Sequence, residues 1–169
     1  MERSKLLLRT AFVCMASDGS INEQEINLVK SYLTADGLFD ANEIDQELEK
    51  LISEFNQDSR RFILDYFNML RSEHLTTDDQ VSIAEFAIGI IRADEVIDYR
   101  EVQFFKHIRS CLAISDCEII NRVEDIEEYL ERDISDKLDL GFDDDQFFST
   151  FNSKQVSIIK TTKSTNENL

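Results

Sequence analysis

Proline is absent from this 169-residue sequence, and glycine occurs only four times. Both residues interrupt regular helices, so their scarcity favours long helices and disfavours an architecture of short strands and tight turns. A composition of 42% apolar and 31% charged residues is typical of a soluble globular protein. The length fits one domain with a substantial core.

Residue patterns that carry catalysis are also missing. The only two histidines, His74 and His107, have no cysteine or acidic partners at zinc-binding spacing. The sequence contains no Glu-x-x-His pair of a di-iron bundle, no glycine-rich phosphate loop, no nucleophile elbow and no cysteine–histidine pairing. We therefore expect a protein that is not an enzyme. We expect His107 to have a packing or surface role and His74 to lie at a helix end.

Positive charge is scarce, because 18 lysines and arginines stand against 35 aspartates and glutamates, for a formal net charge of −17. Such a surface repels phosphate backbones and anionic lipids, so we expect no nucleic-acid partner. The apolar part of the N-terminal MERSKLLLRTAFVC is too short for a signal peptide or a membrane span, so we expect no direct membrane insertion. The acidic surface attracts cations. A second explanation is that it only keeps the protein soluble.

The three cysteines, at positions 14, 111 and 117, form no CxxC motif. Cys14 and Cys111 lie in apolar runs, so we expect buried, reduced thiols rather than a disulfide framework. Together with the lack of a targeting segment, this predicts a cytoplasmic protein.

Apolar residues recur at helical spacing and predict seven helices joined by short turns. We expect the helices at about 4–16, 23–35, 40–55, 58–72, 77–91, 99–111 and 115–130. The first should bury a single stripe of side chains. Capping-box spacing marks three of the starts, at Asp40 and Glu43, at Thr77 and Gln80, and at Ser115 and Glu118.

One stretch of the sequence occurs twice. Residues 11–38 read AFVCMASDGSINEQEINLVKSYLTADGL, and residues 87–114 read AIGIIRADEVIDYREVQFFKHIRSCLAI. Aligned without a gap, each residue of the second copy stands 76 positions after its counterpart, as Asp94 does after Asp18. We therefore expect an all-α bundle of two pseudo-two-fold-related repeats, at about 4–38 and 80–114, within a domain that spans 1–135.

Residues 136–169 are predicted to form a less regular C-terminal extension. Within it DLGFDDDQFFSTF is acidic and aromatic, and QVSIIKTT alternates weakly between apolar and polar residues. Either the aromatic residues pack back on the bundle, or the extension binds a protein partner as a tail.

Helix capping explains part of the repeated turn. With Asn22 and Asp98 as N-caps, Glu25 and Glu101 occupy the third helical position and complete two capping boxes. Each cap contributes roughly 1 kcal/mol. The flanking apolar residues have the spacing of hydrophobic staples, Ile21 with Ile26 and Ile97 with Val102.

Capping does not explain Asp18 and Asp94, because an acid at the C-terminal end of a helix is disfavoured by roughly 0.3–1 kcal/mol. In a two-fold arrangement the turns would bring these aspartates into one space with Glu25 and Glu101. Two carboxylates about 5 Å apart repel by roughly 3 kcal/mol at an effective dielectric near 20, and a hard divalent cation relieves this. Oxygen ligands suit Ca²⁺ or Mg²⁺. The predicted metal ligands are Asp18, Glu25, Asp94 and Glu101, with Asn22 and Asp98 as further candidates.

ASDGSINEQE followed by an apolar helix, together with its repeat RADEVIDYRE, resembles the tellurite-resistance TerB-like family over about residues 4–130. That family has an ADG-I-(D/N)-x-x-E turn between two helices. The resemblance implies a seven-helix bundle of two related halves, with acidic residues near its axis that bind a metal cation. It also implies a link with tellurite and stress-response modules, and a related domain occurs in a membrane-anchored DnaJ-like co-chaperone.

The chain departs from the family pattern at three positions of the turns. Ser17 replaces the usual alanine, Asn22 replaces an acid, and Glu95 replaces glycine. Asn22 lowers the negative charge of the first turn and Glu95 raises that of the second, so both bear on cation affinity and preference.

Three functions remain open from the sequence, and association into a homo-oligomer is open as well. The first function is a cation-binding helical module of the TerB-like type that acts in a stress response through protein partners. The second is a scaffold in which the repeated acids are helix caps and the tail or an apolar groove binds a partner. The third is a metal-dependent hydrolase, which requires an open pocket beside the same acids.

Overall fold

Helices make up nearly all of the regular structure in the computed structural model, which describes residues 3–17, 21–35, 37–72, 74–93, 97, 99–131 and 156–159. In chain order these helices are α1 (Arg3–Met15), α2 (Glu23–Ala35), α3 (Ala41–Gln57), α4 (Ser59–Ser72), α5 (Thr77–Ile91), α6 (Tyr99–Cys111), α7 (Asp116–Ile120) and α8 (Glu127–Leu130). Two short strands accompany them, β1 (Ile21–Asn22) and β2 (Ile158–Ile159). The predicted all-α fold is confirmed.

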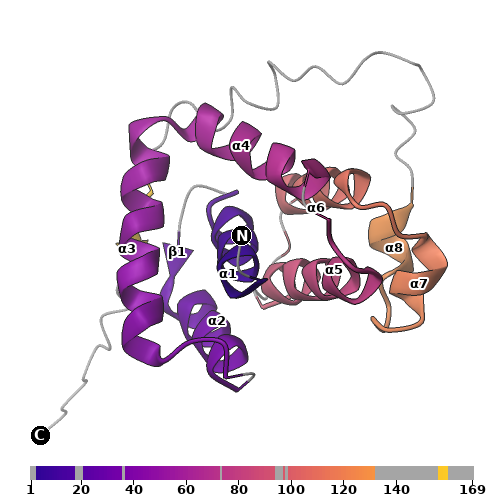
Figure 1. Ribbon diagram of the computed structural model, residues 1–169, viewed down its shortest axis with the longest axis horizontal. Helices are drawn as coiled ribbons and strands as arrows, with labels where there is room; N and C mark the ends of the chain where they lie inside the picture. Colours follow the sequence, from indigo (N-terminus) through magenta and orange to yellow (C-terminus); the bar gives the residue numbers. More distant parts are fainter. Residues whose placement is uncertain are drawn as a thin grey trace, which may run out of the picture.

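Helix α1 lies in the middle of the bundle, where it packs against α5 most extensively and also contacts α2, α3 and α6 (Figure 1). Residues 6–8 and 10–15 are all buried, so the helix is covered on nearly every side. The expectation of a single buried stripe is therefore wrong for α1. A helix that is apolar all round is placed inside a bundle rather than on its surface.

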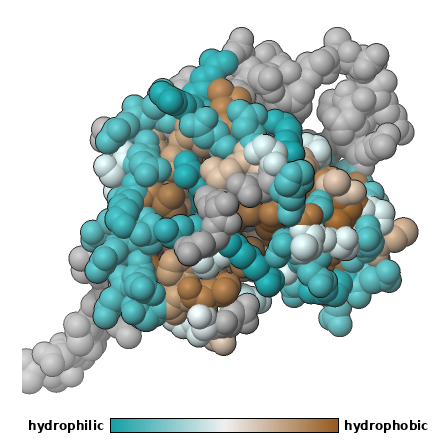
Figure 2. All heavy atoms as spheres, in the orientation of Figure 1, coloured by the Kyte–Doolittle hydropathy of each residue, from teal (hydrophilic) through white to brown (hydrophobic). Residues whose placement is uncertain are grey.

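One hydrophobic core extends from α1 to α8 and also includes Val156. On the α1 side, Phe12, Phe55 and Phe62 meet edge to face, with ring centroids 5.5–5.6 Å apart. This geometry favours aromatic pairs beyond the area they bury. Figure 2 shows hydrophilic atoms over the α3 side of one face and hydrophobic atoms between the helices near its centre. No helix within the described ranges is long and apolar enough to cross a membrane.

The two copies of the repeated stretch form helix pairs with the same spacing. Helix α2 begins at Glu23 and α6 at Tyr99, and each has 13 residues, so both bounds follow the sequence offset. Helices α1 and α5 also end at equivalent residues, Met15 and Ile91. The sequence repeat is thus a repeat of local structure, whereas the two-fold relation between the halves stays a prediction.

Most helix boundaries follow the expected signals. Gly37 has a left-handed φ of 66° after α2, and the Leu38 N–H donates to the Leu33 carbonyl, as in a Schellman cap. The capping boxes that begin α3 and α7 are present as predicted. The box of α5 lies one residue earlier than predicted, on Thr76 and Asp79. Gln80 instead uses its amide to bind the Leu75 carbonyl and the Ala113 N–H.

The predicted helix over 115–130 is two short helices, α7 and α8. Asp125 between them has a φ of 54°, a left-handed conformation that ends helical continuity. Arg92 donates to the carbonyls of Glu124 and Asp125, so this connection is fixed to the end of α5. The apolar spacing therefore placed the buried residues Ile119, Val123 and Ile126 correctly but missed the turn.

The two strands join distant parts of the sequence. Ile21 pairs with Ile158 and Asn22 with Ile159 in a parallel register. The weak alternation in QVSIIKTT therefore marks a short strand rather than a helix. The acidic and aromatic residues that precede it, at 136–155, lie outside the described residues, so the two predictions for them stay open.

Candidate metal centre

Glu25 and Glu101 are buried acids, with only 4% and 5% of their surface exposed. Each lies in the first turn of its helix, α2 for Glu25 and α6 for Glu101. Buried carboxylates are rare unless they are paired or hydrogen-bonded, since burial removes the water that solvates the charge. The helix N-terminus supplies part of that solvation through its free N–H groups and its dipole.

The first turn contains the predicted capping box. The Asn22 N–H donates to Oε2 of Glu25 over 2.8 Å, and the Glu25 N–H donates to Oδ1 of Asn22 over 2.9 Å. The predicted capping role of Asn22 and Glu25 is therefore confirmed. A carboxylate has several lone pairs, so one N–H bond does not prevent Glu25 from binding a cation as well.

The second turn differs from the first. Its cap residue Asp98 lies outside the described residues, so its capping box remains a prediction. Ile21 is 1% exposed beneath the first turn, whereas the equivalent Ile97 is 41% exposed. Only the first turn has its leading isoleucine buried.

The two buried glutamates act electrostatically on the same thiol. Cys14 of α1 is 1% exposed, and burial is the main cause that raises the pKa of its thiol far above the ordinary value. The negative charges of Glu101 and then Glu25 raise the same pKa further. Both carboxylates therefore lie within electrostatic range of Cys14. Each copy of the repeat thus buries one acid at the start of a helix that packs against α1.

The aspartates of the predicted site follow directly on two matched helix ends. After α1, the Ala16 N–H donates to the Phe12 carbonyl and the Ser17 N–H to the Cys14 carbonyl. After α5, the same two bonds recur 76 residues later, from Arg92 and Ala93. Asp18 and Asp94 come next in the sequence, and both lie outside the described residues. Their predicted position beside the glutamates is therefore untested.

Metal ligation is supported by the chemistry of the residues rather than by a complete ligand set. Buried carboxylate oxygens suit a hard divalent cation. Within the ranges that the structure describes, no group of three or more His, Cys, Asp or Glu could hold a metal ion. A cation would therefore need Glu25 and Glu101 together with further ligands from 18–20 or 94–98. The carboxylates of the two glutamates suit such a group.

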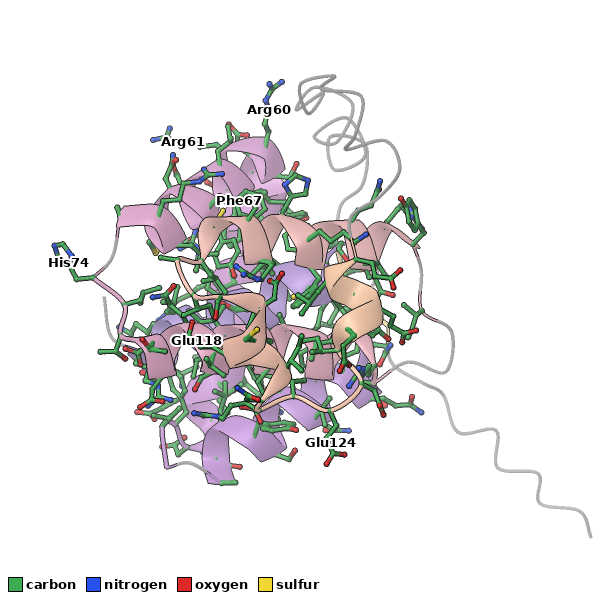
Figure 3. All side chains as sticks on the ribbon, turned by 90° about the vertical axis from the view of Figure 1, so that its right-hand side faces the viewer. Arg60, Arg61, Phe67, His74, Glu118 and Glu124 are labelled. Carbon is green, nitrogen blue, oxygen red and sulfur yellow. The ribbon has the colours of Figure 1, made fainter. Side chains whose placement is uncertain are left out.

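The histidines do not contribute to this site. His74 is exposed and points away from the bundle (Figure 3). The ring of His107 packs against Phe67, with 5.8 Å between centroids. The expected packing role of His107 is therefore confirmed.

Sequence reasoning did not identify Cys14 as a neighbour of the acids. Its counterpart in the second copy is Ile90, so the thiol is not part of the repeated pattern. Its position four residues before Asp18 was the only available signal, because one helical turn separates the two positions.

The comparison with family models decides the classification. The model described as "Tellurite resistance protein TerB" matches residues 7–123, which include both copies of the turn. The chain belongs to the TerB family. Searches of curated proteins and of solved structures gave no significant match. The TerB match covers α1 to α7 and ends before β2, which pairs with the first turn.

Proposed function

We propose that this TerB-family protein is a non-enzymatic module that binds a divalent cation of the Ca²⁺ or Mg²⁺ type and acts through protein partners in a stress response related to tellurite. Glu25 and Glu101 would supply ligands, and Asp18 and Asp94 are the proposed additional ligands. The cation would neutralise the buried negative charge at the two turns and so hold the two helix pairs together.

One observation carries this proposal, namely that each copy of the repeat buries a glutamate at the start of a helix that packs against α1. Helix capping needs each glutamate only at its own helix start and does not require its burial, since the capping residues Glu43 and Glu118 are exposed. A shared cation would stabilise two buried like charges in an interior where water screens them poorly. The family match supports the same class of module.

A scaffold without a cation is the second candidate, and the reciprocal bonds of Asn22 and Glu25 favour it. In that case the first glutamate serves its helix, and the function depends entirely on protein contacts. The two candidates predict different effects of cations on thermal stability once the charges of Glu25 and Glu101 are removed.

Thermal unfolding in EDTA, and then with Ca²⁺, Mg²⁺, Mn²⁺ or Zn²⁺ at constant ionic strength, tests the proposal. A cation that binds only the folded protein at 100 times its dissociation constant adds about 2.7 kcal/mol. For a chain of this size this corresponds to roughly 5–10 °C in Tm. We expect such a shift with one or two ions, and its loss in the double variant Glu25→Gln/Glu101→Gln.

Glu43→Gln is the matched control, because Glu43 completes the capping box of α3 but is exposed. It should keep the full cation response. Asp18→Asn with Asp94→Asn should abolish the response if the aspartates are ligands. If no ion shifts Tm, or if the glutamate double variant responds like the wild type, the cation proposal is wrong and the scaffold remains.

A further inference from the structure

Residues 156–159 are held against the bundle like a bound peptide. The side-chain amide of Asn56, near the end of α3, donates to the Val156 carbonyl over 3.0 Å and accepts from the Val156 N–H over 2.9 Å. Val156 itself is 2% exposed and belongs to the hydrophobic core. Two residues later, Ile158 and Ile159 pair with β1.

These contacts are the ones by which proteins bind extended peptides. Strand addition to an exposed edge supplies backbone hydrogen bonds, and a buried side chain supplies selectivity. Here the edge is β1, which lies beside α3 in the bundle (Figure 1). The Asn56 amide binds both backbone groups of one residue and therefore recognises an extended backbone whatever its side chain. Among residues 156–158, whose side chains the structure describes, only Val156 is buried, so we assign selectivity to it, whereas Ser157 is exposed and Ile158 is 38% exposed.

The docked segment also supports the first acidic turn. Asn22 is at once the strand partner of Ile159 and the cap of α2. Its N–H is already engaged by Glu25, so the strand and the capping box share one residue. Docking of 156–159 therefore fixes the backbone that positions Glu25.

We propose that β1 and α3 form a binding site for an extended peptide, and that residues 156–159 of this chain fill it in cis. The ligand class is an extended segment with a β-branched aliphatic residue at the position of Val156. The contacts of Val156 with Asn56 involve none of the proposed cation ligands, so the test is run in EDTA and stands apart from the test of the proposed function.

Hydrogen exchange of the full-length protein measures docking directly. Val156→Asp places a charge in the buried position, and we expect exchange at residues 156–159 and at 21–25 to become at least about tenfold faster. Ser157→Asp makes the same charge change at the exposed neighbour and should leave both regions protected. Equal loss of protection in the two variants, or in neither, would overturn the proposal.

A second pair of variants tests the same docking if the Val156→Asp protein does not fold. Asn56→Asp keeps one oxygen acceptor but removes the amide that donates to the Val156 carbonyl. It should release the segment, as reported by faster exchange at 156–159. Asn68→Asp makes the same change at an exposed asparagine of α4 and should have no effect. Retained protection in Asn56→Asp would contradict the proposed clamp.

Peptide binding in trans tests whether the edge is a site. The affinity of a fluorescent peptide of residues 153–162 is measured for two full-length proteins, Val156→Asp and Asn68→Asp. We expect the two affinities to differ. The first has an empty edge, whereas in the second the tethered segment competes at high effective concentration. We expect at least about tenfold tighter binding to Val156→Asp, and none by a peptide that carries Val156→Asp.

Peptide binding that is equal in the two proteins, or absent from both, would overturn the proposal. Sedimentation of the wild type identifies the occupant. A monomer supports docking in cis. A wild-type dimer that Val156→Asp converts to monomers would show that the segment docks on a second copy, and would overturn the assignment in cis.

Discussion

At the scale of single residues, a chain of hydrogen bonds in the core links α4 to α1. The Tyr66 hydroxyl donates to Oγ1 of Thr10 over 2.9 Å, and the Thr10 hydroxyl donates to the Leu6 carbonyl over 2.9 Å. Burial raises the pKa of Tyr66 well above its ordinary value of 10.0, and the bond to Thr10 opposes this only in part. The folded state therefore keeps the phenol neutral.

This residue should give the protein a defined loss of stability in alkali. The contribution of Tyr66 is complete below pH 10 and falls as the pH rises, since only the unfolded chain releases the proton. Tyr66→Phe should cost about 1 kcal/mol at pH 8 through the lost hydrogen bond. Between pH 9 and 11 the wild type should lose about 1.4 kcal/mol more than the variant. Urea unfolding across this range measures both effects.

Tyr32→Phe is the control, because it removes the hydroxyl of a tyrosine that is 48% exposed while keeping its ring. It should follow the wild-type pH dependence. A Tyr66→Phe variant whose stability falls as steeply as that of the wild type would refute the assignment to Tyr66.

Residue chemistry was largely predictable where it depends on near neighbours in the sequence. The reciprocal bonds of Asn22 with Glu25 follow from their spacing alone. The position of Cys14 near Glu25 and Glu101 was not predictable, because it depends on how α2 and α6 pack around α1. The spacing of residues in the sequence predicts local hydrogen bonds within one helix. The packing of two helices against each other depends on the whole core.

At the scale of elements, Arg92 connects the end of α5 to the turn between α7 and α8. Its Nη1 donates to the Glu124 carbonyl over 2.8 Å, its Nη2 donates to the Asp125 carbonyl, and its Cζ lies 5.0 Å from the centre of the Tyr129 ring. Arg92→Lys keeps the charge but loses the planar group that makes these contacts together. We expect a cost of about 1–2 kcal/mol in urea unfolding.

Arg61→Lys provides the comparison. The side chain of Arg61 is 79% exposed, and its Nε lies 3.7 Å from Oδ2 of Asp65 on the same helix. Such a surface pair contributes little, so the change should stay within about 0.5 kcal/mol. If both variants lose the same stability, the contacts of Arg92 do not hold the α7–α8 connection.

The lengths and ends of elements were predicted better than their surroundings. Helices α2 and α6 were placed at their observed bounds by apolar spacing and capping signals. The break between α7 and α8 was missed because apolar residues keep their helical spacing across it. The central position of α1 was missed because the predicted stripe includes only some of its buried residues. The helix is in fact buried nearly all round.

At the scale of the whole molecule, a formal net charge of −17 makes self-repulsion a general cost of folding. Salt screens this repulsion, since the Debye length falls from about 30 Å at 0.01 M to about 10 Å at 0.1 M. We expect Tm in EDTA to rise by a few degrees over that range. Choline chloride should act like sodium chloride, because screening requires no site. A fall in Tm with salt would mean that ion pairs outweigh the repulsion.

The overall class of the molecule could be predicted, but the pairing of β1 with β2 could not. Low glycine, no proline and helical spacing were enough for an all-α bundle. The pairing of Ile21 with Ile158 could not be predicted, because weak alternation around a strand of two residues does not identify its partner. The two hydrogen bonds between the Asn56 amide and the Val156 backbone could not be predicted either, because the two residues are far apart in the sequence.

The parallel pairing of β1 with β2 also sets an order of events during synthesis. Residues 21–22 leave the ribosome long before residues 158–159 have been made, so the edge at the first turn has no strand partner while most helices are already available to pack. An open edge on a nascent chain is a place where other chains can pair. The last described residues of the protein therefore complete the site that its first helix pair begins.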